Sequence, residues 1–354
     1  MVFPNLRAPI TPRFDIFING QPLSNQSFDA FSHIVRLVVD DDTELPSMFT
    51  LEFTSAEDSE NLWLNDYGLF AIGAEVEIQV GYDNNIETLI LGEITGLEPR
   101  FSVSDPLSLI VRGYDRRHRL QRGRKTRSFV DQKDSDIAAR IAQEVSLSPN
   151  VTDSSVLHPY VLQANQTDWE FLQQRAKQIQ YEVVVEGKTL FFRPVNNSNS
   201  AELTLSLDDY LLEFCPYLSS VGQVNQVTVR GWDFQQNAVI SGNSSTVTNM
   251  GGRRNGAELS SQAFGNAIAQ ISNHPIMSQS EADQLAVAQL NRTALNLITG
   301  EGVCLGSTNL RAGRVIEIKD IGLRFSGRYY VTSASHRYSY EGYYTHFCVR
   351  RNAS

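Results

Sequence analysis

The residues of this chain that could most directly do chemistry are the positive side chains between Arg112 and Phe129. This stretch reads RGYDRRHRLQRGRKTRSF and holds seven arginines, one lysine and one histidine. Closely spaced guanidinium groups can contact successive phosphates, and such binding weakens as salt rises because counterions are released. The whole chain, however, carries a formal net charge of -10, which repels a polyanion on average. Arg112 to Arg127 is thus a candidate nucleic-acid contact in a chain whose overall charge opposes one.

The same arginines could instead hold parts of a protein together. The stretch has only two aromatic residues, Tyr114 and Phe129, and no helix-turn-helix or RNA-recognition signature accompanies it. The chain has 40 acidic against 30 basic side chains, so carboxylates that can pair with arginines are plentiful. We therefore favour a strand exit and linker whose arginines contact neighbouring domains or subunits. The candidates are Arg116, Arg117, Arg119, Arg122, Arg124 and Arg127.

A second cluster of arginine, histidine and tyrosine lies near the C-terminus. It consists of Arg324, Arg328, His336, Arg337 and Tyr338, with Tyr329, Tyr330, Tyr340, Tyr343 and Tyr344 nearby. Alternation along RYYVTSASHRYS places these side chains on two faces of a strand, which disfavours a single ligand pocket. Tyrosine and arginine are enriched at protein interfaces. We interpret the cluster as barrel wall or subunit contact, with Arg324, Arg328 and Arg337 as further interface candidates.

Motifs of the common enzyme classes do not occur in the sequence. The six histidines are far apart and form no HExxH, and there is no Cys-x-x-Cys, Walker loop, GxGxxG or GxSxG. Cys215, Cys304 and Cys348 stand singly in apolar surroundings, which is typical of buried thiols in a reducing compartment. The sequence thus predicts no enzyme activity, no metal and no cofactor. A polysaccharide hydrolase would need a positioned pair of carboxylates and has little support.

The elements that must position these side chains begin as β-strands. Residues 1–118 contain short runs that alternate or are apolar, separated by turn sequences such as NGQPL, DDDTELP and GYDNN. We expect one antiparallel sheet here, closed as a barrel. From 119 to 202 helical periods appear in DSDIAARIAQEV and TDWEFLQQRAKQI, and a hairpin in YEVVVEGKTLFFRP. Thr167 and Glu170 form a capping box before the second helix, so this module is α+β.

The rest of the chain returns to β-sequence around an insertion. Strand-like runs occupy 203–236 and 301–351, and we expect them to form a second barrel. The insertion, 237–300, combines a glycine- and serine-rich stretch with helical sequence. Its residues 241–256 are expected to be a mobile loop or a contact arm that orders on assembly. The predicted fold class is mixed α+β and mostly β, with two antiparallel barrels, an α+β module between them and a helical insertion.

The C-terminal strand series repeats the N-terminal one. In the first match Gly73, Glu77 and Ile78 align with Gly313, Glu317 and Ile318 at an offset of 240 residues. In the second, Ile94, Thr95, Arg100, Phe101 and Ser102 align with Val331, Thr332, Arg337, Tyr338 and Ser339 at an offset of 237. In the third, Val111 and Arg112 align with Val349 and Arg350 at an offset of 238. Short matches in a shared order are what two copies of one strand series give. We infer two related barrels in one chain, a duplication that suggests ring-building.

The basic stretch RGYDRRHRLQRGRKTRSF, the helical DSDIAARIA, the segment RAKQIQYEVVVEGKTLFFRP and the C-terminal sequence that begins LRAGRVIEIKD resemble the phage late control gene D family. Members of this family are the central baseplate hub of contractile phage tails. The hub is shared with contractile injection systems and with the N-terminal half of VgrG proteins. The resemblance spans nearly the whole chain and is closest over 107–194 and 302–351. It implies a homotrimer in which each chain gives two tube-like barrels, so that a threefold spike docks beneath sixfold tube rings. It further implies an inner tube ring, a separate spike protein and other baseplate components as partners.

The resemblance also fixes what we expect of localisation. The N-terminal sequence has no apolar run of signal-peptide length, and no stretch approaches the length of a membrane span. We expect a protein that is cytoplasmic in the producing bacterium, is incorporated into a tail or injection particle and has no stable membrane insertion. The chain ends at Ser354 directly after the last hub strand, so the spike is expected to be a separate protein. The lysozyme that is fused in some relatives is expected to be absent. Beyond passage through a channel, no nucleic-acid binding is expected.

Overall fold

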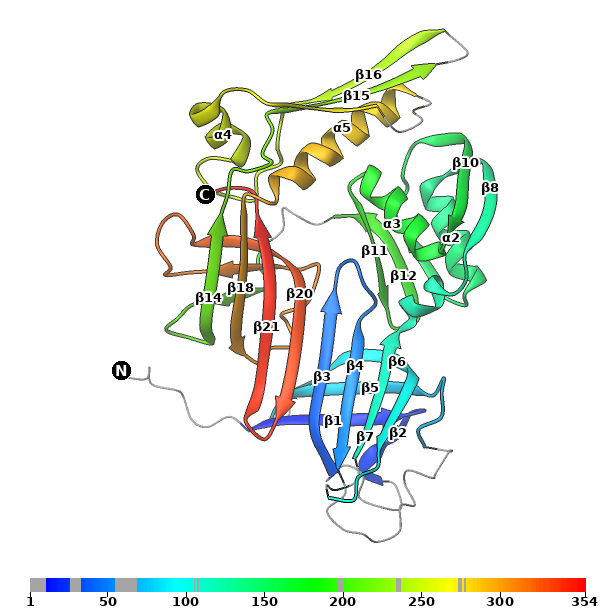
Figure 1. Cartoon of the computed structure of the whole chain (residues 1–354), viewed down its shortest axis with the longest axis vertical. Coiled ribbons are helices and arrows are strands. Elements are labelled where there is room, and N and C mark those ends of the chain that lie inside the picture. The colour runs from blue at the N-terminus through cyan, green and yellow to red at the C-terminus, as the bar shows by residue number, and fades with distance from the viewer. Residues whose placement is uncertain are drawn as a thin grey trace.

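The computed structural model describes residues 11–25, 33–54, 69–83, 85–104, 106, 108–195, 200–233, 237–272, 276 and 278–354. About half of these residues lie in β-strands, and most of the strand pairs are antiparallel, as predicted. A large sheet fills one end of the molecule, and two smaller units that carry the helices lie at the other end (Figure 1). In the described residues, no helix has the length and apolar character needed to cross a membrane.

The large sheet has thirteen strands from both ends of the chain. The N-terminal strands are β1 (Pro12–Ile18), β2 (Gln21–Pro22), β3 (Ile34–Asp42), β4 (Met48–Thr54), β5 (Glu75–Tyr82), β6 (Asn85–Arg100) and β7 (Ser108–Asp115). The C-terminal strands are β13 (Leu203–Leu205), β14 (Leu211–Leu218), β18 (Ile298–Leu305), β19 (Val315–Ile318), β20 (Gly327–Ser339) and β21 (Gly342–Arg351). Their main order is β14-β18-β21-β20-β3-β4-β7-β6-β5-β1-β2, with β19 and β13 branching from β20.

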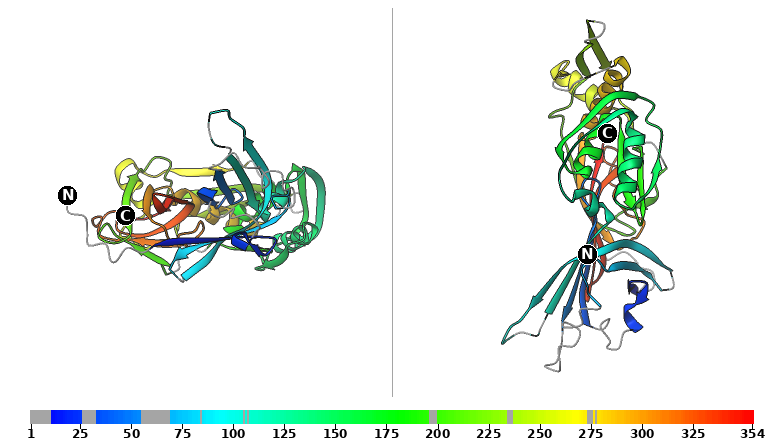
Figure 2. Two further views of the ribbon diagram at one scale, coloured as in Figure 1. Left: turned by 90° about the horizontal axis from the view of Figure 1, so that it is seen from below. Right: turned by 90° about the vertical axis from the view of Figure 1, so that its right-hand side faces the viewer.

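The two expected barrels are not confirmed in the single chain. The described strands form one open path that begins at β14 and ends at β2, and the ladder between β20 and β3 joins the two series. In the side view the N-terminal strands diverge instead of closing on themselves (Figure 2). The two predicted β-regions are therefore halves of one sheet.

The two halves share one strand order. Reading outward, the first half runs β3-β4-β7-β6-β5-β1 and the second runs β14-β18-β21-β20-β19-β13. The last member differs in direction, since β1 is antiparallel to β5 whereas β13 is parallel to β19. Six strands in the same order within one chain support the internal repeat that the sequence matches predicted.

The ladder registers also agree between the halves. Glu75 of β5 pairs with Glu93 of β6, and Val315 of β19 pairs with Tyr330 of β20, which reproduces the sequence offsets of 240 and 237. A β-bulge interrupts the β6 ladder to β7 between residues 94 and 96, and another interrupts the β20 ladder to β21 between residues 331 and 333. These are equivalent positions at the offset of 237, so the repeat extends to an irregular feature of the sheet.

The third sequence match is wrong by two residues. Ile94 lies opposite Gly113, and its equivalent Val331 lies opposite Val349. Gly113 therefore corresponds to Val349, whereas the sequence match assigned Val349 to Val111. Alternating apolar residues look alike after a shift of two, so sequence similarity alone could not fix this strand.

The middle module forms as predicted in most of its parts. Its helices are α2 (Asp134–Glu144) and α3 (Asp168–Gln178), and Thr167 and Glu170 form the expected capping box. Its hairpin is β11 (Tyr181–Glu186) with β12 (Thr189–Pro194), to which β9 (Ser148–Val151) adds a parallel strand. The basic stretch differs from the expected linker, because it forms the 3-10 helix η3 (Arg116–Gln121) and then β8 (Lys125–Lys133), paired with β10 (Leu157–Gln166).

The second of the two smaller units contains a strand that we expected in the second barrel. β15 (Gln226–Asp233) pairs with β16 (Ala238–Ser244) and β17 (Ile268–Ile271), and not with the large sheet. Its Val227 and Val229 pack with Leu285 and Ala286 of α5 (Gln279–Ala294). The unit also includes α4 (Gly256–Phe264). Between β16 and α4, Met250 is buried and its backbone N–H bonds to Asn352.

Candidate functional site on the large sheet

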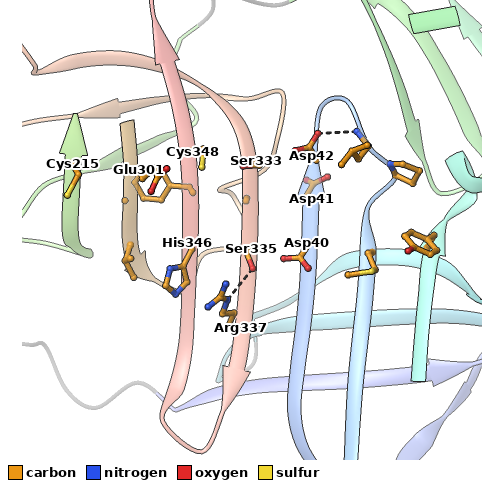
Figure 3. A pocket seen from close by; sticks show the side chains of 18 of the residues that line it. Asp40, Asp41, Asp42, Cys215, Glu301, Ser333, Ser335, Arg337, His346 and Cys348 are labelled. Atoms are coloured by element: carbon orange, nitrogen blue, oxygen red, sulfur yellow. Dashed lines mark hydrogen bonds between the residues drawn. The ribbon is translucent and has the colours of Figure 1, made fainter. Parts of the chain in front are cut away.

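One face of the large sheet is polar and forms a broad depression. Ladder partners place Glu213, Val303, His346, Ser335 and Asp40 in one row across five strands. The next row holds Cys215, Glu301, Cys348, Ser333 and Asp42. Figure 3 labels Asp40, Ser335 and His346 of the first row and all five members of the second, and shows them on this part of the sheet. Because successive residues of a strand point to opposite faces, the residues between these rows face the core.

The depression is acidic and has a volume of about 820 Å³. Five carboxylate side chains line it: Asp40, Asp42, Glu213 and Glu301 on the two rows, and the buried Asp41 between them. The guanidinium of Arg337 lies there too. Arg337 Nε donates to Ser335 Oγ at 3.3 Å, and Asp42 Oδ1 accepts backbone N–H groups of the turn after β3. Negative charge on this face favours cations and disfavours polyanions.

The thiol of Cys215, which lines this depression, is not an activated nucleophile. Cys215 Sγ lies 3.5 Å from a carboxylate oxygen of Glu213, and this hydrogen bond raises the pKa of the thiol. The thiolate is the reactive form of cysteine, so a raised pKa lowers its reactivity. Within the described residues, no group of three His, Cys, Asp or Glu side chains could hold a metal ion. His274 lies outside the described residues.

The first arginines of the basic stretch bind carboxylates inside the chain. Arg116, which is 5% exposed, donates to Glu75 Oε2 at 2.5 Å and contacts Glu93 at 3.3 Å. Arg119 Nη2 donates to Glu93 Oε1 at 2.5 Å. Arg116 also reaches the carbonyl oxygen of Gly187 in the β11–β12 turn at 3.5 Å. These contacts join the N-terminal half of the sheet to the middle module.

Arg117 is the centre of a second, more buried network. It is 4% exposed, and it donates to Asp115 Oδ2 at 2.6 Å, to the carbonyl oxygen of Asp42 at 2.8 Å and to Ser47 Oγ. Its guanidinium lies 3.6 Å from Asp41 and over the ring of Trp169, 5.8 Å from the centroid.

Asp41 extends this network to the C-terminal half of the sheet. Its Oδ2 accepts from Arg311 Nε at 2.9 Å and from the backbone N–H of Ala312 at 3.2 Å, while Oδ1 accepts from Ser47 Oγ. Arg311 belongs to the loop between β18 and β19. The network therefore ties together the β3–β4 turn, η3 and a loop of the second half.

The remaining arginines of the basic stretch lie along β8 or just before it. Arg127 binds Glu144 and Asp168, with its closest contact to Glu144 at 2.6 Å. Arg124 binds Glu170 at 3.0 Å. Arg122 is exposed at the end of η3. Five of the six candidates thus have carboxylate partners in their own chain, so few of their charges are available to phosphates.

The three C-terminal candidates do not come together into one site. Arg324 is exposed in the loop before β20, and Arg328 is half-buried near Gly251. Arg337 is exposed on the polar face. Between them in sequence, His336 is fully buried and lies 2.9 Å from the hydroxyl of Tyr343. Alternation along β20 separates these side chains onto two faces, as the sequence pattern predicted.

The buried network predicts an acid-dependent loss of stability. Burial opposes ionisation of Asp41, but Arg311 and Arg117 outweigh it and lower the pKa to about 2 from 3.8. A lowered folded-state pKa stabilises the protein above the unfolded-state value and loses this effect as pH falls toward 2. We expect Asp41→Asn to remove about 2 kcal/mol of acid-dependent stability. Urea unfolding of both proteins between pH 5 and 2 measures it, and parallel curves would contradict the assignment.

Sequence reasoning missed the exposed apolar residues at the two ends of the row of eight strands β14-β18-β21-β20-β3-β4-β7-β6. At the end of β6, Leu97, Phe101 and Val103 are 39%, 75% and 110% exposed. On and after β14, Leu212 and Tyr217 are 51% and 67% exposed. The alternation of apolar residues along LEPRFSV was the available signal. This alternation continues beyond Arg100, the last residue of β6 that pairs with β7.

Comparison with known proteins shows where this fold occurs. The 43 kDa tail protein of prophage MuSo2 from Shewanella oneidensis has a TM-score of 0.71 at 14% identity, over 96% of this chain and 98% of that one. A tail protein of Neisseria meningitidis gives 0.70 at 12% identity, over 96% and 97%. An E. coli component of the type VI secretion system, similar to T4 phage tail proteins gp27 and gp5, gives 0.60 at 13% identity, over 95% and 76%.

These identities are low, so the solved structures establish a shared tail-protein fold. No curated protein sequence matches the chain. The family model of the Alg8 N-terminal domain matches residues 11–340, which include every described strand of the large sheet except β21. The chain therefore belongs to the Alg8 N-terminal domain family.

Proposed function

We propose that the protein is a structural hub in the baseplate of a contractile phage tail or a contractile injection system. Its fold is shared with phage tail proteins and with a component of the type VI secretion system. In this role it has no catalytic activity. It stays bound at the tip of the inner tube, carries the push of sheath contraction from tube to spike, and leaves a central passage for cargo.

The observation that carries this proposal is the repeated six-strand order. Each chain offers two similar units, so a homotrimer presents six of them around one axis. Six similar units can make equivalent contacts with a sixfold tube ring, while three chains match a threefold spike. We propose that the two halves complete tube-like barrels in this assembly, as the resemblance to late control gene D proteins implies.

The same arrangement gives the polar face a role. In a ring of such sheets the face that carries Asp40, Glu213 and Glu301 lines the passage, and the opposite face holds the cores. The carboxylates of these rows would give the passage a negatively charged wall, on which Met48 and Val303 are also present. The partners are the tube ring, the spike and other baseplate components.

The proposal is tested by mass measurement and electron microscopy of the full chain with its tube and spike proteins. We expect a stable trimer, in which each interface buries about 2,000 Å² or more, and a threefold object with six lobes. A chain that stays monomeric at micromolar concentration with both partners present would overturn the proposal. Tight, salt-sensitive DNA binding that is lost in an Arg122→Ala, Arg124→Ala, Arg127→Ala variant would instead favour the nucleic-acid function.

A further inference from the structure

The two halves of the sheet are joined by the ladder between β20 and β3, and the described strands contain no second copy of this ladder. The second part of β20, residues 333–339, pairs with β3. The equivalent part of β6, residues 96–100, has β7 as its one ladder partner among the described strands. The strand equivalent to β3 is β14, whose one described partner is β18. The repeat thus leaves two complementary edges, β14 and the end of β6, at opposite ends of the row of eight strands from β14 to β6.

We propose that these edges pair with each other between copies of the chain, with residues 96–102 of one copy antiparallel to residues 213–219 of the next. This inference adds detail to the proposed function, and the number of copies in the ring rests on that proposed function. The pairing itself follows from the ladder inside the chain. That ladder serves as the template for the contact between copies.

The register of this contact follows from equivalent ladder positions. Leu37 of β3 lies opposite Leu51 of β4, and Leu51 opposite Val111 of β7. In the second half, Phe214 lies opposite Gly302, and Gly302 opposite Phe347. Gly113 corresponds to Val349, so Val111 corresponds to Phe347, and through the ladders Leu37 corresponds to Phe214.

The template then fixes the pairs across the interface. Leu37 lies opposite Tyr338, and Tyr338 corresponds to Phe101. Phe101 of one copy therefore lies opposite Phe214 of the next. One residue earlier on β6, Arg100 lies opposite Cys215, just as Arg337 lies opposite Val38 within the chain.

Side-chain chemistry agrees with this register, which was derived from backbone pairing alone. On the core side it brings Leu97 to Leu218 and Phe101 to Phe214, so apolar groups that are exposed at the end of β6 become covered. On the polar side Arg100 comes beside Glu213. A slip by one residue would turn Phe101 toward the polar face and Arg100 toward the core.

Two prolines weaken the backbone part of this contact. Within the chain, Thr43 N donates to Thr332 O, so alternate residues of β20, His336 among them, direct their backbone groups at β3. At the proposed interface Pro99 corresponds to His336 and lies opposite Pro216. Neither has an N–H, so the central pair makes no ladder hydrogen bond. Packing of Leu97 and Phe101 must supply the affinity, and the prolines protect the edges from promiscuous pairing.

Cysteine cross-linking tests the register in the full chain. The pair of Arg100 and Cys215 is equivalent to one that does not exchange hydrogen bonds, where opposed Cα atoms lie close enough for a disulfide. We expect Arg100→Cys, mildly oxidised at micromolar concentration, to lose its monomer band to reducible dimers and trimers and to give nothing larger. Arg100→Cys with Cys215→Ala should keep its monomer band.

A neighbouring position provides the matched control. Glu98→Cys with native Cys215 is two residues out of register, which is too far for a disulfide, and should stay uncrosslinked. Glu98→Cys with Tyr217→Cys in a Cys215→Ala background is in register and should cross-link. This second in-register pair tests the register even if the Arg100→Cys variant fails to fold.

The outcomes separate this inference from the proposed function. Suppose that the protein is a trimer by mass. If Glu98→Cys then cross-links to Cys215, or if neither in-register pair cross-links, the edge pairing is wrong while the hub function still stands. A reducible ladder beyond trimer supports the edge pairing but contradicts the closed ring. A monomer with both partners present and without cross-links overturns both.

Discussion

Replacing Arg117 with alanine is expected to lower the free energy of unfolding by about 3–5 kcal/mol. The change leaves Asp115 and Asp41 in the interior without their shared guanidinium, and Ser47 and the carbonyl oxygen of Asp42 without a donor. Burial already raises the pKa of Asp115 despite its contact with Arg117, so its charged form is costly once that contact is lost. Urea unfolding followed by tryptophan fluorescence at fixed protein concentration measures the loss.

Arg124→Ala is the matched control from the same basic stretch. Arg124 and its partner Glu170 are about half exposed, and surface ion pairs of this kind contribute about 0–1 kcal/mol. Equal losses for the two variants would contradict the assignment of Arg117 as a structural centre. A large loss of stability for Arg117→Ala also gives a reason other than phosphate contact for any loss of function in that variant.

Phe49→Ala is expected to cost about 3–5 kcal/mol, because the ring is fully buried in the N-terminal core. Gly113 on the neighbouring strand leaves the space that the ring fills, since a Cβ there would lie 2.3 Å from the ring. Removing the ring therefore opens a cavity between β4 and β7, which Gly113 cannot fill because it has no side chain.

Phe264→Ala serves as the comparison for this second variant. Phe264 ends α4 and is 79% exposed, so its removal should change the free energy of unfolding by less than about 0.5 kcal/mol. Both variants are measured by the same denaturant titration. A Phe49→Ala protein as stable as Phe264→Ala would show that the β4–β7 layer contributes little to the folded state.

Local signals in the sequence predicted the middle module well. The capping box of Thr167 and Glu170 and the four-residue spacing of Ile137 and Ile141 depend on contacts within a few residues, so the helices form where expected. The repeat was also visible, because Glu77 and Glu317 occupy equivalent ladder positions and Thr95 and Thr332 lie at the equivalent bulges of the two halves.

What the sequence could not supply were the partners of strands and charges far apart in the chain. β15 has the same Arg-Gly-aromatic-Asp exit as β7, yet it pairs with β16, because a strand pattern does not specify which edge it joins. Arg117 looks like its neighbours Arg116 and Arg119 in sequence. Its burial depends on Asp41, Ser47 and Trp169, which come from other elements.

The bulge at Thr332 limits how this part of the gene can change. Two residues there oppose one on β21, so the bulge sets which face every later residue of β20 occupies. Deleting Thr332 would turn Ser335 and Arg337 inward and His336 outward. We therefore expect natural variants of this strand to differ by substitution, with insertions and deletions confined to the connecting loops.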